Sequence, residues 1–188
     1  MKDKLILIGA STGGPGHLKK ILSALGNDFE TPIIIAQHMN EIFLQSFAKQ
    51  FDSELFQKVV LVDGTCKIQK RHIYICAKSC VLESQYGASS LACKLDYESY
   101  YNPSIECIFG SALGMLEKFT FLAVLLTGIG QDGAVNIDLL QKNGVRCIAE
   151  SEETAIVFGM PKQAALLNKN IEVLPLYSII SVIKQFGA

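Results

Sequence analysis

Short, β-branched apolar runs alternate with helical patterns along most of the chain, and this alternation restricts the fold more than any other feature. The runs include KLILIG at residues 4–9, PIIIAQ at 32–37 and FTFLAVLLTG at 119–128. Segments with apolar residues at helical spacing, such as 15–25 and 134–144, lie between such runs. Continuous apolar strands separated by helices are typical of a parallel sheet covered by helices on both faces.

A denser group of runs interrupts this alternation between residues 58 and 95. KVVLVDG, HIYICAK, CVLESQYG and SSLACKL follow one another with turn residues between them, which is typical of strands that include a hairpin. The sequence therefore predicts an α/β fold: a doubly wound, mostly parallel sheet with helices on both faces and an antiparallel hairpin insertion. Since the 188 residues contain no internal repeat or linker, we expect residues 1–188 to form a single domain.

Composition excludes several classes of partner. The formal net charge of -1 provides no basic field for nucleic acid. The apolar runs are far shorter than the ~20 residues of a membrane span, and the N-terminal run, which faintly imitates a signal peptide, breaks at Gly9. We therefore expect a cytoplasmic protein with no membrane insertion and no nucleic-acid partner.

Six cysteines are scattered through apolar surroundings. They form no C-x-x-C pair, and no histidine lies at metal-ligand spacing from them. We interpret them as buried thiols that behave as small hydrophobic residues, and we expect neither a bound metal nor a disulfide framework.

Three polar residues stand where predicted strands end. Ser11 follows the first strand, His38 ends the second, and Asp132 lies just past the strand FLAVLL. Since the carboxyl ends of parallel strands share one edge of the sheet, these residues are expected to lie close together. A serine hydroxyl is a weak nucleophile, an imidazole can take its proton, and a carboxylate can orient the imidazole.

Each of these residues also has a structural interpretation. Ser11 could cap the following helix, His38 could be a core histidine bonded to a backbone carbonyl, and Asp132 could be the N-cap of a helix that begins near Gly133. Their joint placement favours a catalytic triad. The other histidines are weaker candidates, because His17 lies within a predicted helix and His72 begins a strand.

The glycine-rich turn at residues 9–14 could indicate a dinucleotide-binding enzyme or a serine hydrolase, and the positions of its glycines distinguish the two. A dinucleotide fingerprint requires G-x-G-x-x-G and an acid near the end of the second strand, but Ser11 replaces the second glycine and His38 ends that strand. The segment from Gly9 to Gly13 instead matches G-x-S-x-G between a strand and a helix. The chain order Ser, His, Asp differs from that of the α/β-hydrolases.

Several motifs in the same order resemble the catalytic domain of the chemotaxis protein-glutamate methylesterase (CheB) family. The matching pieces are IGASTGGP, PIIIAQHM followed by FLQSFAKQFD, HIYICA, NPSIECIF, LLTGIGQDGA and AIVFGMPKQA. The resemblance implies Ser11 as nucleophile, His38 as base and Asp132 as acid, with oxyanion donors at the backbone N–H groups of Thr12 and Ile129. It implies hydrolysis of glutamate methyl esters on the helical cytoplasmic domain of chemoreceptors, receptor glutamine deamidation as a second candidate activity, and no metal or cofactor.

The chain departs from the family pattern at two places. Family members usually carry basic residues before the Pro-Ser motif, whereas Tyr100, Tyr101 and Asn102 precede Pro103 here. Typical members also carry an N-terminal receiver domain, and because Ser11 is close to the start we expect no receiver domain within this chain. Two alternatives stay open: a Rossmann-like nucleotide-binding enzyme, and a non-catalytic receptor-binding module.

Overall fold

A seven-stranded sheet forms the centre of the computed structural model, which describes residues 2–85, 88–93 and 99–187. Its order is β10-β9-β8-β1-β2-β5-β3, and the pairings between neighbouring strands are parallel. The strands of this sheet are β1 (Asp3–Ala10), β2 (Ile33–Gln37), β3 (Lys58–Val62), β5 (His72–Cys76), β8 (Phe119–Leu125), β9 (Arg146–Glu150) and β10 (Glu172–Leu174).

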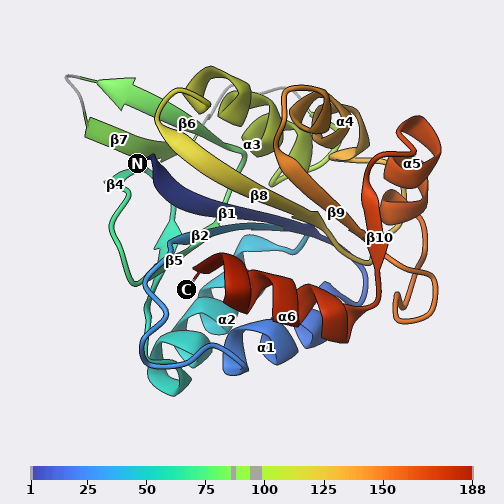
Figure 1. The fold of residues 1–188 in the computed structure, drawn as a ribbon. Helices are drawn as coiled ribbons and strands as arrows, with labels where there is room; N and C mark the ends of the chain where they lie inside the picture. The colour runs from blue at the N-terminus through green and yellow to red at the C-terminus, as the bar shows by residue number, and fades with distance from the viewer. Residues whose placement is uncertain (1, 86–87, 94–98, 188) are drawn as a thin grey trace.

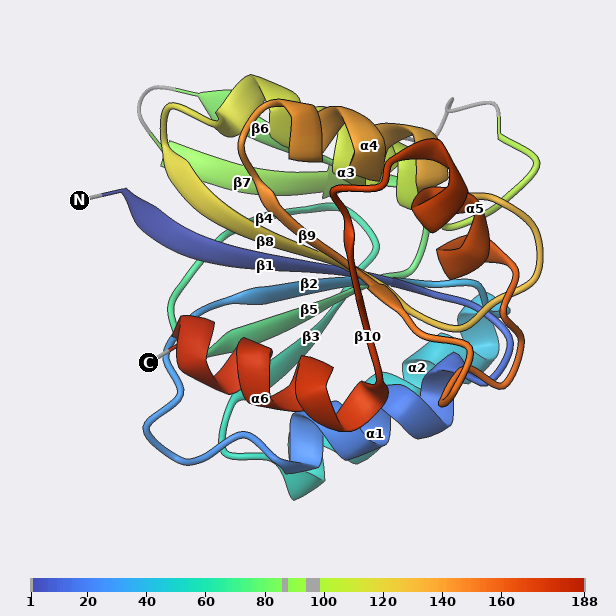
Figure 2. The ribbon, with the colours of Figure 1, turned by 45° about the vertical axis from the view of Figure 1, so that its right-hand side comes forward.

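Helices cover both faces of this sheet, as predicted (Figure 1). Three helices lie on one face with a short 3-10 helix: α3 (Ile105–Ala112), η1 (Leu113–Met115), α4 (Ala134–Lys142) and α5 (Met160–Leu167). The other face is covered by α1 (Gly14–Ser23), α2 (Glu41–Glu54) and α6 (Leu176–Gly187), which lie together below the sheet in Figure 2. The doubly wound α/β prediction is therefore confirmed.

Two apolar layers form the core, one on each face of the sheet. On β1, Leu5 and Leu7 pack in the layer beneath α3, α4 and α5, whereas Ile6 and Ile8 pack in the layer above α1, α2 and α6. All four side chains are fully buried. A strand buried on both faces needs an uninterrupted apolar run, which explains the pattern that identified β1 in the sequence.

A three-stranded antiparallel sheet carries the predicted hairpin. It pairs β4 (Thr65–Lys67), β7 (Ala88–Cys93) and β6 (Cys80–Gln85) in the order β4-β7-β6. The hairpin is therefore confirmed, and β4 is a third strand that the sequence pattern did not predict. Parts of the two predicted hairpin strands, residues 86–87 and 94–95, lie outside the described residues.

The strand order reverses direction at β1. On one side of β1 lie β2, β5 and β3 in that order, with β3 at the edge although it precedes β5 in the chain, and β8, β9 and β10 continue from β1 on the other. The loops that follow β1 and β8 therefore diverge at the carboxyl edge between these two strands. In open α/β sheets such a switch point is where ligands and chemistry gather. Ser11 and Asp132 lie in these two loops.

The described cysteines are free thiols, and all six are at least partly buried. Within the described residues, no group of three or more histidine, cysteine or acidic side chains is arranged to hold a metal ion. In the same part of the chain, no helix combines the length and the apolar character needed to cross a bilayer.

Candidate active site

Ser11 is held in a tight turn directly after β1. Its backbone N–H donates to the carbonyl of Thr127 at 2.9 Å, and its own carbonyl accepts from the N–H of Gly14 at 2.8 Å. Gly13 takes the left-handed conformation with φ 85° and forms the N-cap of α1. A residue with a side chain resists this conformation, so glycine at this position lets the chain turn from strand to helix within three residues.

Two backbone N–H groups beside Ser11 are available for a ligand. Within the described residues, neither the Thr12 N–H nor the Ile129 N–H has a hydrogen-bond acceptor. The Thr12 carbonyl accepts from the Thr127 hydroxyl at 2.8 Å, which ties the loop after β1 to the loop after β8. The oxyanion-donor assignment from the sequence stays a prediction, and the available N–H groups are compatible with it.

His38 directly follows β2, the strand that pairs with β1. Ala10 pairs with Gln37 in the β1–β2 ladder, so the residues that come next, Ser11 and His38, leave adjacent strands side by side. The buried side chain of Gln37 joins the two strand ends, because its Nε2 donates to the carbonyl of Ser11 at 2.9 Å and to that of His38 at 3.0 Å. This bridge was not predicted from the sequence.

Asp132 is the point where four donors converge. His38 Nε2 lies 2.7 Å from Asp132 Oδ2, and the Ile105 N–H donates to the same oxygen at 2.7 Å. The Glu106 N–H donates to Asp132 Oδ1 at 3.0 Å, and the Ser104 hydroxyl lies 3.4 Å from it. The first N–H groups of α3 carry partial positive charge, so they stabilise a carboxylate here.

Asp132 therefore does not cap the helix that follows it, contrary to the structural alternative considered for it. Gly133 is the N-cap of α4, without a side-chain cap, and Asp132 reaches across to the neighbouring helix α3 instead. The start of α4 is held in the same way by a side chain of α3, because the Glu106 carboxylate accepts from the N–H groups of Val135 and Asn136 in the first turn of α4. Burial raises the pKa of the Glu106 carboxyl above its ordinary value, and the nearby Asp132 carboxylate adds to the shift.

The three predicted residues are thus brought to one edge of the sheet, but only one of the two expected side-chain links is formed. His38 and Asp132 are bonded, and their side chains are 13% and 2% exposed. Within the described residues, the Ser11 hydroxyl makes no hydrogen bond. Their roles as nucleophile, base and acid stay predictions.

The other two histidines lie away from this arrangement. His72 is the first residue of β5, at the opposite edge of the sheet, as expected. His17 is buried in α1, where its Nδ1 lies 3.2 Å from the fully buried carboxylate of Glu150, which also accepts from the Thr127 N–H at 2.9 Å. This pair lies beneath the loops that carry the site, and the sequence pattern did not predict it, because the two residues are 133 positions apart.

Tyr101 is a further neighbour of the site that sequence reasoning did not place. Its ring stacks on the imidazole of His38, with centroids 4.7 Å apart and planes within 4° of parallel. It also lines a cavity of about 390 Å³ together with Asp132, Ser104 and Glu106. The sequence marked Tyr101 only as a departure from the family pattern, and no local signal indicated the stack.

The hydrogen bonds indicate how the site can handle a proton. An ionised carboxylate offers only acceptors, so the proton of neutral His38 is assigned to Nε2, where it faces Asp132. The lone pair of Nδ1 is then free to accept the proton of an attacking hydroxyl. An imidazole oriented in this way, beside a serine in a strand-to-helix turn, is suited to acyl transfer.

Comparisons with known proteins agree with this arrangement. The family model described as CheB methylesterase matches residues 6–183. A protein-glutamate methylesterase/protein-glutamine glutaminase 2 of Carboxydothermus hydrogenoformans is 39% identical over 181 residues, which cover 94% of this chain and 51% of that protein. A protein-glutamate methylesterase/protein-glutamine glutaminase of Caldanaerobacter subterraneus is 35% identical over 187 residues, which cover 97% and 51%.

A solved structure shows the same fold. The crystal structure of the Thermotoga maritima CheB methylesterase catalytic domain matches with a TM-score of 0.88 and 31% identity, over 98% of this chain and 99% of that one. The chain spans about half the length of the curated relatives it matches. The family predicted from the motifs is confirmed, and a Rossmann-like nucleotide-binding enzyme is set aside. The chain belongs to the CheB methylesterase family.

Proposed function

We propose that this chain is a serine hydrolase that demethylates glutamate methyl esters on chemoreceptors. The observation that carries the proposal is the His38–Asp132 bond of 2.7 Å at the sheet edge where Ser11 turns out of β1. The names of the relatives, protein-glutamate methylesterase/protein-glutamine glutaminase, support the choice of substrate. Residues 1–188 are proposed to act as one catalytic domain, since the family model spans nearly all of them.

In the proposed acylation step, Ser11 Oγ attacks the carbonyl carbon of the methyl ester and His38 Nδ1 takes the hydroxyl proton. The imidazolium that forms is stabilised by Asp132, which keeps its own negative charge. The oxyanion of the tetrahedral intermediate is bound by the N–H groups of Thr12 and Ile129. When the intermediate collapses, His38 returns the proton to the leaving methoxide, and methanol departs.

In the proposed deacylation step, water takes the place of methanol. His38 removes a proton from the water as it attacks the glutamyl ester of Ser11, and the intermediate collapses to glutamic acid, which releases its proton to solvent as the free carboxylate. The proton held by His38 passes to Ser11 Oγ, which restores the resting site. The same two steps on a glutamine side chain release ammonia instead of methanol, so deamidation is a second candidate activity of the same residues.

The surroundings of the site fit a macromolecular substrate. Four apolar side chains near the ends of the strands are 62–71% exposed: Ile42, Phe43, Ile129 and Ile156. Ile42 and Phe43 lie in the first turn of α2, just after His38, and Ile129 and Ile156 belong to the segments that flank Ser11. Exposed apolar side chains around a site are typical of a surface that receives another protein. A receptor's cytoplasmic domain as substrate would place the reaction in the cytoplasm.

The direct test of this function is methanol release from methylated receptor. Wild-type chain is expected to release methanol, and Ser11→Ala and His38→Ala are each expected to lower the rate by roughly a million-fold, because nucleophile and base act as a unit. Ser181→Ala is the matched control, since Ser181 is an exposed serine on α6 and bonds only within that helix. If Ser11→Ala kept more than about a tenth of the wild-type rate, the nucleophile assignment would be wrong.

An assay of ammonia release, run beside the methanol assay, distinguishes demethylation from deamidation and from receptor binding without catalysis. Ammonia release from unmethylated receptor measures deamidation, and the same variants are expected to abolish it. If wild-type chain binds receptor but releases neither methanol nor ammonia, the chain is a non-catalytic receptor-binding module and the proposed function is refuted.

A further inference from the structure

The imidazole of His38 is held at one of its edges and covered on one of its faces. The bond from Nε2 to Asp132 fixes the edge, and the ring of Tyr101 covers the face, with centroids 4.7 Å apart and an angle of 4° between the planes. A parallel pair with this separation has the offset-stacked geometry that aromatic rings prefer. Tyr101 is one of the three residues before Pro103 where this chain departs from the basic residues usual in the family.

The neighbouring loops are built to receive the Tyr101 ring. Gly130, in the loop after β8, has φ 89°, and a Cβ at this position would collide with the Tyr101 hydroxyl. Within its own segment, the Tyr101 N–H donates to the Ser99 hydroxyl at 3.1 Å, and the ring of Tyr100 meets Tyr101 edge-on with centroids 5.1 Å apart. Residues of two loops therefore contact the tyrosine that stacks on His38.

The segment that carries Tyr101 also positions Asp132. Asn102 Oδ1 accepts from the Ser79 N–H at 3.0 Å, and the Ser79 hydroxyl accepts from the Ser104 N–H at 2.9 Å. Ser104 is the N-cap of α3, whose first N–H groups hold the Asp132 carboxylate. One segment thus supplies the face contact of His38 and helps to hold Asp132, which makes the edge contact.

We propose that Tyr101 is a positioning residue for the reaction, whose ring keeps the imidazole of His38 in the plane that brings Nδ1 to the Ser11 hydroxyl and stabilises the imidazolium formed in the transition state. This inference rests on the proposed function, because it assigns Tyr101 a role in that same site. An imidazole bonded only at Nε2 can still tip about that bond, and the parallel stack opposes this motion. The face of a phenol ring also attracts a cation within about 6 Å of its centroid, so the contact strengthens when His38 takes the proton.

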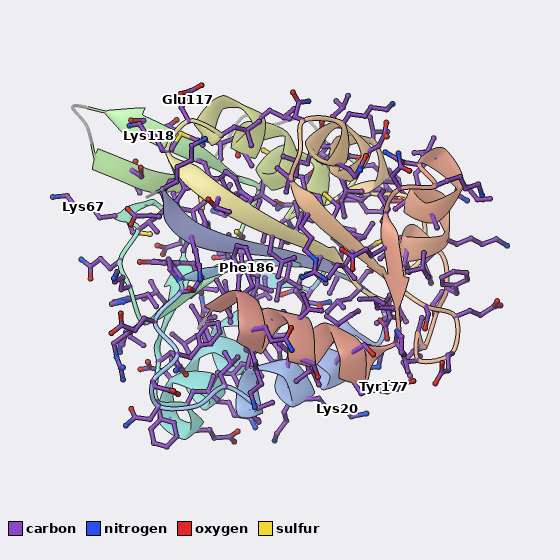
Figure 3. All side chains as sticks on the ribbon, in the orientation of Figure 1. Lys20, Lys67, Glu117, Lys118, Tyr177 and Phe186 are labelled. Atoms are coloured by element: carbon purple, nitrogen blue, oxygen red, sulfur yellow. The ribbon has the colours of Figure 1, made fainter. Side chains whose placement is uncertain are left out.

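Replacing Tyr101 with leucine removes the π face and keeps an apolar side chain of similar reach. We expect kcat to fall fivefold to tenfold, about 0.9 to 1.4 kcal/mol, with KM unchanged, because the lost contact is strongest in the transition state. Tyr101→Phe keeps the ring and loses only the hydroxyl, so it is expected to keep the wild-type kcat. Tyr177→Leu makes the same substitution on α6 (Figure 3), which covers the face of the sheet opposite to α3, and it is expected to leave kcat and KM unchanged.

Labelling of the chain by a fluorophosphonate, a small serine-directed probe, separates this inference from the proposed function. The labelling rate depends on activation of Ser11 by His38 and needs no receptor, so Tyr101→Leu is expected to lower it by the same factor while Tyr101→Phe does not. If wild-type chain releases no methanol but is labelled, the proposed function fails and the labelling ratios still decide the role of Tyr101.

Three results would overturn the inference. The leucine variant could label at the wild-type rate, which would show that the stack has no effect on Ser11. The phenylalanine variant could fall as far as the leucine variant, which would assign the effect to the hydroxyl. The leucine variant could change KM alone, which would make Tyr101 a substrate contact. Urea unfolding followed by far-UV circular dichroism, suited to a chain without tryptophan, checks that each variant is folded.

Discussion

Asp132 is predicted to stabilise the fold as well as the active site, and two substitutions separate these contributions. Asp132→Ala removes the acceptor of His38 Nε2 and of the N–H groups of Ile105 and Glu106. Asp132→Asn keeps a side-chain oxygen that can still accept from the start of α3, because asparagine caps helices nearly as well as aspartate. Its amide group, however, cannot accept the Nε2 proton of His38 and the N–H groups of α3 all at once.

The expected magnitudes follow from these contacts. Losing a side-chain acceptor for the first N–H groups of a helix costs about 1 kcal/mol, a buried donor without acceptor costs about 1–3 kcal/mol, and loss of an anion at a helix N-terminus costs up to about 1 kcal/mol. For Asp132→Ala we expect the free energy of unfolding to fall by about 3–4 kcal/mol. For Asp132→Asn we expect a fall of only about 1–2 kcal/mol, although the rate of ester hydrolysis falls by roughly 10⁴-fold.

Urea unfolding of the two variants measures this difference. With a slope near 2 kcal/mol per molar urea, the midpoint of Asp132→Ala should move down by about 1.5–2 M, and that of Asp132→Asn by about 0.5–1 M. Ser11→Ala is the control, and because the Ser11 hydroxyl makes no hydrogen bond in the described residues, its midpoint should stay near that of wild type. An Asp132→Ala chain as stable as Ser11→Ala would refute the stabilisation of the first turn of α3 by this carboxylate.

Two further substitutions test the support beneath the site, each by urea unfolding with its own control. Glu150→Ala leaves buried His17 without its 3.2 Å partner and is expected to lower the free energy of unfolding by about 3 kcal/mol. Glu150→Gln keeps an acceptor for His17 and should lower it clearly less. An equal loss of stability in both variants would contradict the role of Glu150 as the acceptor for His17. Gly13→Ala forces a side chain into φ 85° and against Ile156, where its Cβ would lie 2.6 Å from the Ile156 side chain, and should cost about 1–2 kcal/mol. Gly16→Ala, whose new Cβ would meet no atom within 4 Å beyond the adjacent residues and the backbone of its own helix, should stabilise α1 by up to about 1 kcal/mol. A loss of stability in Gly16→Ala would contradict the argument that the cost at Gly13 comes from its conformation and its contact with Ile156.

The architecture of the sheet was predictable because it depends on local patterns. Strands buried on both faces need a continuous apolar run, as at residues 5–10 of β1 and 33–36 of β2, and the helices between them show their spacing in the sequence. The carboxyl-end rule then places Ser11, His38 and Asp132 at one edge without any knowledge of strand order. Strand β4 was missed because only three residues pair in it, too few for a pattern.

The contacts that orient the site were not predictable, because each joins residues far apart in the chain. The structural alternative for Asp132 was the N-cap of its own helix, but its carboxylate accepts from the first N–H groups of α3, which begins 27 positions earlier. Which of two neighbouring helices a carboxylate reaches depends on how α3 and α4 pack, and no local propensity records that packing. The stack of Tyr101 on His38 and the pairing of His17 with Glu150 have the same origin.

The central claim, that Ser11 is a nucleophile activated by His38, is tested most directly by mapping the site of covalent modification. The chain is treated with a fluorophosphonate, digested and analysed by mass spectrometry, beside His38→Ala. The account predicts modification of Ser11 alone in wild type and labelling of His38→Ala that is slower by several orders of magnitude. Modification at another serine, or labelling of His38→Ala at the wild-type rate, would contradict it.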